Sequence, residues 1–123
     1  MMRRAKAGWL AWIVALAAPP ALAHHTFAMF DSRSEVTLTG TVREFQWTNP
    51  HSWLQLEVER GSSTVEYSIE LGSPNSMSRR GWRRTTFKPG DRVTAVVNPM
   101  RDGSRGGSLV YALDAQGTRW AWR

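Results

Sequence analysis

Cysteine is absent from this chain of 123 residues, and histidine occurs only three times. Without cysteine no disulfide can form, so hydrophobic packing must hold the fold together. The same absence excludes a thiol nucleophile, and none of the serines lies in a Gly-x-Ser-x-Gly motif. These absences predict a protein that is not an enzyme.

Long apolar runs are also missing. The uncharged run at residues 8–18 has about 11 residues, whereas a membrane-spanning helix needs ~20. Three basic residues precede this run, and two prolines and the small-residue sequence Ala21-Leu22-Ala23 follow it. This order is typical of a secretory signal, and an uncleaved membrane anchor is the alternative. We therefore predict a signal peptide at residues 1–23 and a periplasmic or secreted protein without a stable membrane span.

Cleavage after Ala23 would leave residues 24–123, which suffice for one small domain. It would remove Arg3, Arg4 and Lys6 and so lower the net charge from +6 to +3. This modest charge, together with export, argues against nucleic acid as a partner. Five of the seven tryptophans remain, and large aromatic side chains can supply much of a small core.

Polar and apolar residues alternate along most of the remaining chain, as they do in strands buried on one face. In the first alternating segment the apolar positions change parity after Glu44, which predicts a bulge or bend near Gly40. Between the third and fourth segments, Ser73 can cap a helix, Pro74 suits its first position and Gly81 can end it. The predicted elements are strands at 36–47, 52–59 and 64–71, a helix at about 74–80, a turn and strand at 88–99, and a strand at 108–115.

Three strands, a short helix and two more strands are the order of the five-stranded oligonucleotide/oligosaccharide-binding (OB) barrel. We therefore predict an all-β fold, a small five- to six-stranded OB-like barrel with one short helix between strands 3 and 4. The tail after residue 115 adds a short sixth strand or packs its two tryptophans on the barrel end. The predicted barrel spans residues 36–123 and follows an N-terminal arm at 24–35. A flat sandwich of similar strands is the alternative.

Four stretches of the sequence resemble a known family of small exported bacterial proteins, catalogued as domain of unknown function 6152. They are LAHHTFAMFD, VTLTGTVREFQWTNPHSWLQLEV, YSIELGSPNSMSRRGW and KPGDRVTAVVNPMRDGSRGGSLVYA. The likeness covers nearly all of residues 24–115 and implies an exported, single-domain protein. It also implies that His24, His25, the turn at 48–51 and the stretch at 79–82 match the family's motifs. It implies no activity, because that of the family is unknown.

Two of the three histidines are neighbours at the predicted cleavage site. Cleavage would make His24 the first residue, so that its α-amine and its imidazole can chelate one metal ion. The α-amine has a pKa of about 7.7–8.0 and can lose its proton to a metal near neutral pH. His25 and His51 are candidate further ligands, and an all-nitrogen set suits Cu(II), while Met29 or Met100 would suit Cu(I). The plainer alternatives are a polar chain end and, for His51, a structural hydrogen bond.

The loops after the first and fourth predicted strands lie beside each other in this barrel type, where they bind ligands. Both begin with Asn-Pro, at residues 49–50 and 98–99. Trp53 can stack on a ligand, and Arg101 and Arg105 can pair with an anion. The alternative places Trp53 in the core or at its edge and both arginines in solvent.

A basic stretch at residues 78–88 is a second candidate surface for an anionic partner. Its predicted ligand-binding residues are Arg79, Arg80 and Trp82. The alternative is a solvated loop with Trp82 in the core.

We therefore expect an exported, non-catalytic binding protein that binds copper through His24, His25 and His51. The alternative is an interaction module of the cell envelope that holds an anionic ligand or partner. It would use either the loop rim, formed by Trp53, Arg101 and Arg105, or the basic stretch. The sequence leaves the ligand and the oligomeric state open.

Overall fold

The computed structural model describes residues 27–122. The predicted signal peptide and the predicted metal ligands His24 and His25 lie outside the described residues. The elements, in chain order, are η1 (Phe27–Met29), β1 (Val36–Gln46), β2 (Trp53–Arg60), β3 (Ser63–Glu70), α1 (Pro74–Ser78), β4 (Arg92–Pro99), β5 (Gly106–Leu113) and β6 (Arg119–Ala121). Within residues 27–122, no helix is long and apolar enough to span a bilayer.

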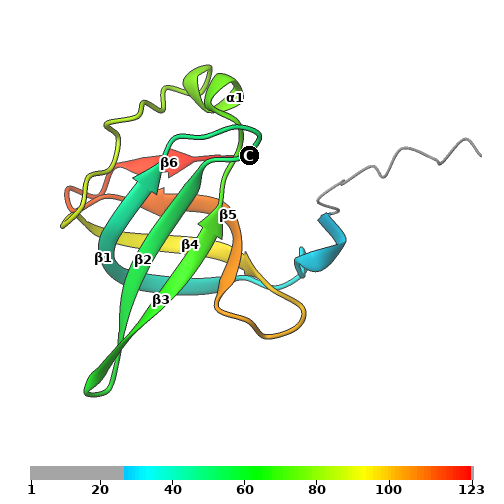
Figure 1. Cartoon of the computed structure of the whole chain (residues 1–123), viewed down its shortest axis with the longest axis vertical. Coiled ribbons are helices and arrows are strands. Elements are labelled where there is room, and N and C mark those ends of the chain that lie inside the picture. The colour runs from blue at the N-terminus through cyan, green and yellow to red at the C-terminus, as the bar shows by residue number, and fades with distance from the viewer. Residues whose placement is uncertain (1–26, 123) are drawn as a thin grey trace, which may run out of the picture.

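The strands form one sheet in the order β3-β2-β1-β4-β5-β6. A parallel pairing between β3 and β5 joins Ser68–Glu70 to Gly106–Ser108 and closes the first five strands into a barrel. Among the described strands, β6 pairs only with β5. The helix α1 follows β3 in the chain and lies at one end of the barrel (Figure 1). The predicted fold class, an all-β OB-like barrel with one short helix after the third strand, is confirmed.

The first strand is long and bends as the sequence predicts. Its register against β2 shifts between Val42 and Glu44, where the parity of the apolar positions changes. Beside this bulge, a Cβ atom on Gly40 would lie 2.2 Å from the carbonyl oxygen of Glu57, so only glycine fits there. The bend lets β1 pair with β2 and with β4, which the barrel requires.

The core combines the inward aliphatic residues of the strands with an aromatic cluster at the α1 end of the barrel. Trp82, only 1% exposed, contacts Phe45, Phe87 and Trp120 at centroid distances of 5.6–6.1 Å. The Trp82 indole nitrogen donates a hydrogen bond of 2.9 Å to the carbonyl of Ala121. The loop after α1 and the strand β6 are thereby held on one core.

The short helix begins as predicted and ends two residues early. Ser73 caps it by accepting a hydrogen bond from the Ser76 amide, and Pro74 is its first residue. It ends at Ser78, and Met77 is its buried anchor. The chain then reverses through Gly81, whose φ of 87° lies in the left-handed region that favours glycine.

Candidate functional site

A pocket of about 210 Å³ lies on the outer surface of the barrel, where β3 pairs with β5. The sheet contributes Trp53 from β2, and Ser68 and Glu70 from β3. Trp53 and Glu70 are partners in the β2–β3 register, so their side chains lie next to each other on one face. Because the inward residues Leu54 and Ile69 fill the core, this outer face is available to a ligand.

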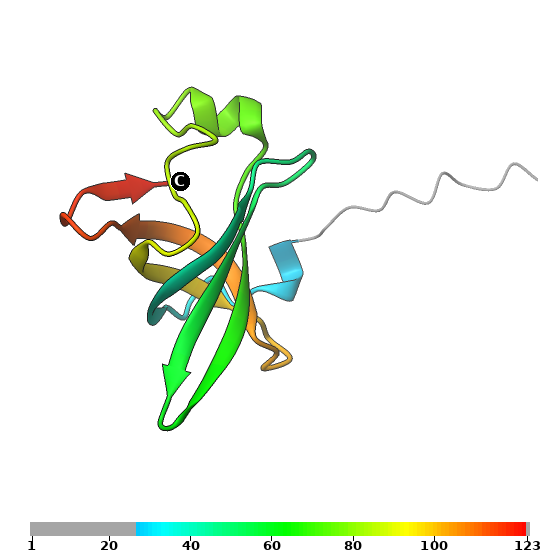
Figure 2. The same cartoon turned by 60° about the vertical axis from the view of Figure 1, so that its left-hand side comes forward.

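Two segments far apart in sequence form the remaining walls. Met29 and Phe30 come from the N-terminal segment, and Met100 comes from the loop between β4 and β5. Phe30 and Met100 form an isolated antiparallel bridge, and the Arg101 amide donates to the carbonyl of Met29 at 2.9 Å. Both segments lie on the same side of the barrel (Figures 1 and 2). The bridge therefore brings Met29 and Met100 to one pocket.

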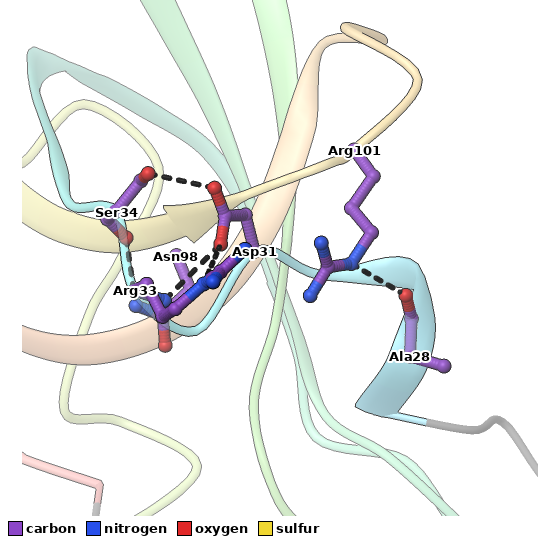
Figure 3. A network of polar contacts seen from close by, with 6 residues as sticks. All are labelled: Ala28, Asp31, Arg33, Ser34, Asn98 and Arg101. Atoms are coloured by element: carbon purple, nitrogen blue, oxygen red, sulfur yellow. Dashed lines mark hydrogen bonds and ion pairs between the residues drawn. The ribbon is translucent and has the colours of Figure 1, made fainter.

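The N-terminal segment is held in place by a polar network (Figure 3). Asp31 accepts hydrogen bonds from the Ser34 hydroxyl at 2.7 Å and from the Arg33 amide at 3.2 Å. The Ser34 hydrogen bond is the main cause that lowers the pKa of the Asp31 carboxyl below its usual value. Asn98 donates to the Ser34 carbonyl at 2.9 Å and ties the same turn to the end of β4.

Two glycines at the start of β5, Gly106 and Gly107, line the pocket. A Cβ atom on Gly106 would lie 2.8 Å from the Ser68 carbonyl oxygen, and one on Gly107 would lie 2.7 Å from that of Asn98. The backbones of β3, β4 and β5 therefore approach closely here. Neither position can therefore hold a larger residue unless the neighbouring backbone shifts.

Glu70 is the one acidic side chain that lines the pocket, and it is only 6% exposed. Its Oε1 lies 3.2 Å from His51 Nδ1, which is also 3.1 Å from the carbonyl oxygen of Leu71. Its Oε2 is buried and has no hydrogen-bond partner among the described residues. An unsatisfied oxygen on a buried carboxylate is costly, because water no longer solvates it. A donor or a cation that reaches Oε2 would remove that cost.

His51 orients Glu70 from beside the pocket. Both neighbours of its Nδ1 are acceptors, so Nδ1 carries a hydrogen and Nε2 has the lone pair when the ring is neutral. The Thr48 hydroxyl donates to the His51 carbonyl at 2.7 Å and fixes the loop after β1. The structure thus connects His51 to the pocket through Glu70, although His51 is not among the lining residues.

The predicted loop rim is only partly brought together. Trp53 and Arg105 line the pocket, and the Arg105 side chain is exposed. Arg101 does not line it. Its Nε donates a hydrogen bond of 2.9 Å to the carbonyl of Ala28, so its guanidinium group holds the N-terminal segment (Figure 3).

The predicted basic surface lies elsewhere, at the α1 end of the barrel. Arg79 and Arg80 are exposed, as expected. Trp82 is buried in the core instead of lying on the surface, because its ring packs between Phe45, Phe87 and Trp120. Its indole therefore cannot stack on an external ligand, and the prediction of Trp82 as a ligand-binding residue is corrected.

Sequence patterns indicated the position of Glu70 but not its burial. Alternation along β3 places Glu66, Ser68 and Glu70 on the outer face, which would ordinarily be solvated. Glu66 is exposed and forms an ion pair of 2.7 Å with Arg43. Glu70 is covered because the N-terminal segment and the β4–β5 loop pack over that end of β3, and no local pattern encodes this contact.

Donors for a metal ion are present at the pocket but do not form a conventional acidic or histidine cluster. Over residues 27–122, no group of three or more His, Cys, Asp or Glu side chains is placed to hold a metal ion. Among the lining residues, Glu70 carries a carboxylate, and Met29 and Met100 carry thioethers.

Comparison with known proteins gives one result. No curated protein and no solved structure matches this sequence. A family model, described as a family of unknown function (DUF6152), matches residues 11–109 and so covers most of the chain, including the residues that form the pocket. The chain therefore belongs to the DUF6152 family.

Proposed function

We propose that this protein is an exported, non-catalytic binding protein that holds a copper ion at the Glu70 pocket, the cavity lined by Trp53, Glu70, Met29 and Met100. His24 and His25 supply nitrogen ligands, and the two methionines supply sulfur. The observation that carries this proposal is that Met29 and Met100 line one pocket together with a buried carboxylate whose Oε2 has no partner in the described chain.

The donor types suit copper. Thioether sulfur is a soft ligand that selects Cu(I), whereas imidazole and amine nitrogens also bind Cu(II). Methionine is commonly a packing residue in a core. Here, however, Met29 and Met100 are partly exposed at a pocket, unlike the fully buried Met77 of α1. Their position is consistent with a role as ligands.

The chain between the predicted N-terminal ligands and the pocket is short. Met29 lies five residues after His24, so five Cα–Cα steps separate them. A chain extends by at most ~3.6 Å per residue, so these five residues span no more than ~18 Å. A nitrogen pair at the new N-terminus and the two thioethers can therefore bind the same ion.

The charge of Glu70 favours a cation over the alternative anionic ligand. An anion beside Trp53 would meet the buried carboxylate of Glu70 in the same wall. Arg105 would attract the anion, but its side chain is exposed. Solvent therefore screens the charge of Arg105 more strongly than the charge of the buried Glu70. Trp53 also suits a cation, since the face of an indole ring attracts positive charge. His51 keeps Glu70 oriented, as residues behind metal ligands commonly do.

The N-terminal contribution is tested by titrating Cu(II) into protein that begins at His24 and into the same protein acetylated at that residue. Acetylation removes the amine ligand and leaves every side chain in place. We expect it to weaken binding at least about tenfold, or ~1.4 kcal/mol, measured by calorimetry. A His25→Ala variant tests the second nitrogen ligand in the same way. Equal thermal unfolding midpoints of the unmodified, acetylated and His25→Ala proteins would show that the fold is intact. Equal affinity with and without the acetyl group, or no binding by either protein, would refute the proposal.

A further inference from the structure

The segment at residues 79–88, which we call the cationic strap, carries five exposed basic side chains. They are Arg79, Arg80, Arg83, Arg84 and Lys88. No acidic residue occurs from residue 71 to residue 90. The rest of the described chain contains seven arginines and all ten acidic residues. Positive charge is therefore concentrated in the strap, while the rest of the domain is net negative.

Two buried aromatic residues fix the strap to the barrel. Trp82 and Phe87 are 1% and 3% exposed and contact each other at 5.8 Å. The backbone between them turns through a hydrogen bond of 2.9 Å from the Thr86 amide to the Arg83 carbonyl. Because both aromatic side chains point inward, the basic side chains between and beside them are left on the surface.

The strap's charges are not neutralised within the described residues. None of its five basic side chains forms a salt bridge with an acidic side chain there. The guanidinium group of Arg80 lies over the ring of Trp122, 5.7 Å from its centroid. Trp122 and Trp47 are partly exposed at the same end, where Trp47 joins the core through Phe45. Partly exposed indoles thus adjoin the basic side chains.

We infer that the cationic strap binds the anionic headgroups of a phospholipid bilayer. Each Lys or Arg near an anionic membrane surface strengthens binding by about fivefold. Tryptophan is enriched at the membrane interface, which suits Trp47 and Trp122. A soluble polyanion such as single-stranded nucleic acid would use the same charges, and the vesicle experiment below distinguishes it from a bilayer.

Such docking would leave the Glu70 pocket accessible. The helix α1 lies at one end of the barrel and the β4–β5 loop at the opposite end, in both views (Figures 1 and 2). The strap follows α1, whereas Met100 and Arg105 of the pocket belong to the β4–β5 loop. Membrane binding by the strap and ligand binding by the pocket are therefore separate functions that different variants can remove.

The test is cosedimentation of protein containing residues 24–123, which includes every described strand and helix, with phosphatidylglycerol or phosphatidylcholine vesicles. We expect the protein to bind only to phosphatidylglycerol vesicles, and we expect the bound fraction to fall as NaCl is added. The double variant Arg83→Ser/Arg84→Ser should bind about 25-fold more weakly, because two contributions of about fivefold are lost.

The matched control is Arg33→Ser/Arg60→Ser, which removes the same charge from exposed sites outside the strap. It should change binding less than about threefold, since long-range charge effects are screened at physiological salt. Equal losses in the two double variants, equal binding to both vesicle types, or binding to soluble polyanions but not to vesicles would overturn the inference. Unchanged unfolding midpoints show that neither variant acts by unfolding the protein.

Discussion

Replacement of both Met29 and Met100 with leucine should lower the affinity for Cu(I) on the order of 100-fold, about tenfold for each soft ligand removed. Both side chains line the Glu70 pocket, and the Phe30–Met100 bridge holds their two segments together. Leucine keeps the volume and apolar character of methionine, so each substitution should cost less than about 1.5 kcal/mol of stability. Competition with a chromophoric Cu(I) chelator under ascorbate measures the affinity.

The matched control for this prediction is Met77→Leu. Met77 is fully buried in α1 and is not among the pocket residues. Its replacement is therefore the same methionine-to-leucine change, made in the core and not at the pocket. Its replacement should leave Cu(I) affinity unchanged. If the Met29/Met100 double variant binds Cu(I) as tightly as the parent protein, the thioethers are not ligands and the copper proposal loses its sulfur donors.

Replacement of Trp82 with alanine should produce the largest loss of stability, about 3–5 kcal/mol. The substitution removes the ring that joins Phe45, Phe87 and Trp120, and it leaves the Ala121 carbonyl without its indole donor. For a domain of this size the expected fall in the unfolding midpoint is on the order of 15–30 °C. Thermal unfolding followed by circular dichroism measures it.

Trp53→Ala is the comparison for that prediction. Trp53 is partly exposed on the outer face of β2, at the pocket, so its removal leaves a smaller cavity in the packed core. We expect a stability loss well below that of Trp82→Ala. Similar losses for the two variants would contradict the assignment of Trp82 to the core and of Trp53 to the pocket.

Local sequence patterns predicted most of the fold because each depends on neighbouring residues. Alternation placed the first three strands within one residue of their observed bounds, and the change of parity after Glu44 located the bulge of β1. The Ser73-Pro74 pair located the start of α1. The fifth strand begins at Gly106, two residues before the predicted start. Gly106 and Gly107 belong to the strand because they pair with β3, but two glycines show no polar–apolar alternation from which this could be predicted.

The candidate site was less predictable, because it depends on contacts between distant segments. The loop positions predicted that Trp53 and Arg105 lie near each other, and both line the pocket. Arg101, predicted on the same two loops, does not line it and bonds to the Ala28 carbonyl instead. The ligand-binding roles of these residues stay predictions. Glu70 looked like an ordinary outer-face residue, since its burial comes from segments about 30 to 40 residues away in sequence. The buried position of Trp82 follows from packing with Phe45 and Trp120, which no spacing rule encodes.

We propose above that one copper ion is shared between the new N-terminus and the methionines of the Glu70 pocket. X-ray absorption spectroscopy of copper-loaded, ascorbate-reduced protein beginning at His24 reports the atoms that coordinate this ion. We predict both nitrogen and sulfur in the first coordination shell, with the sulfur signal lost in the Met29→Leu/Met100→Leu variant. A shell made only of nitrogen and oxygen in the unmodified protein would contradict the claim.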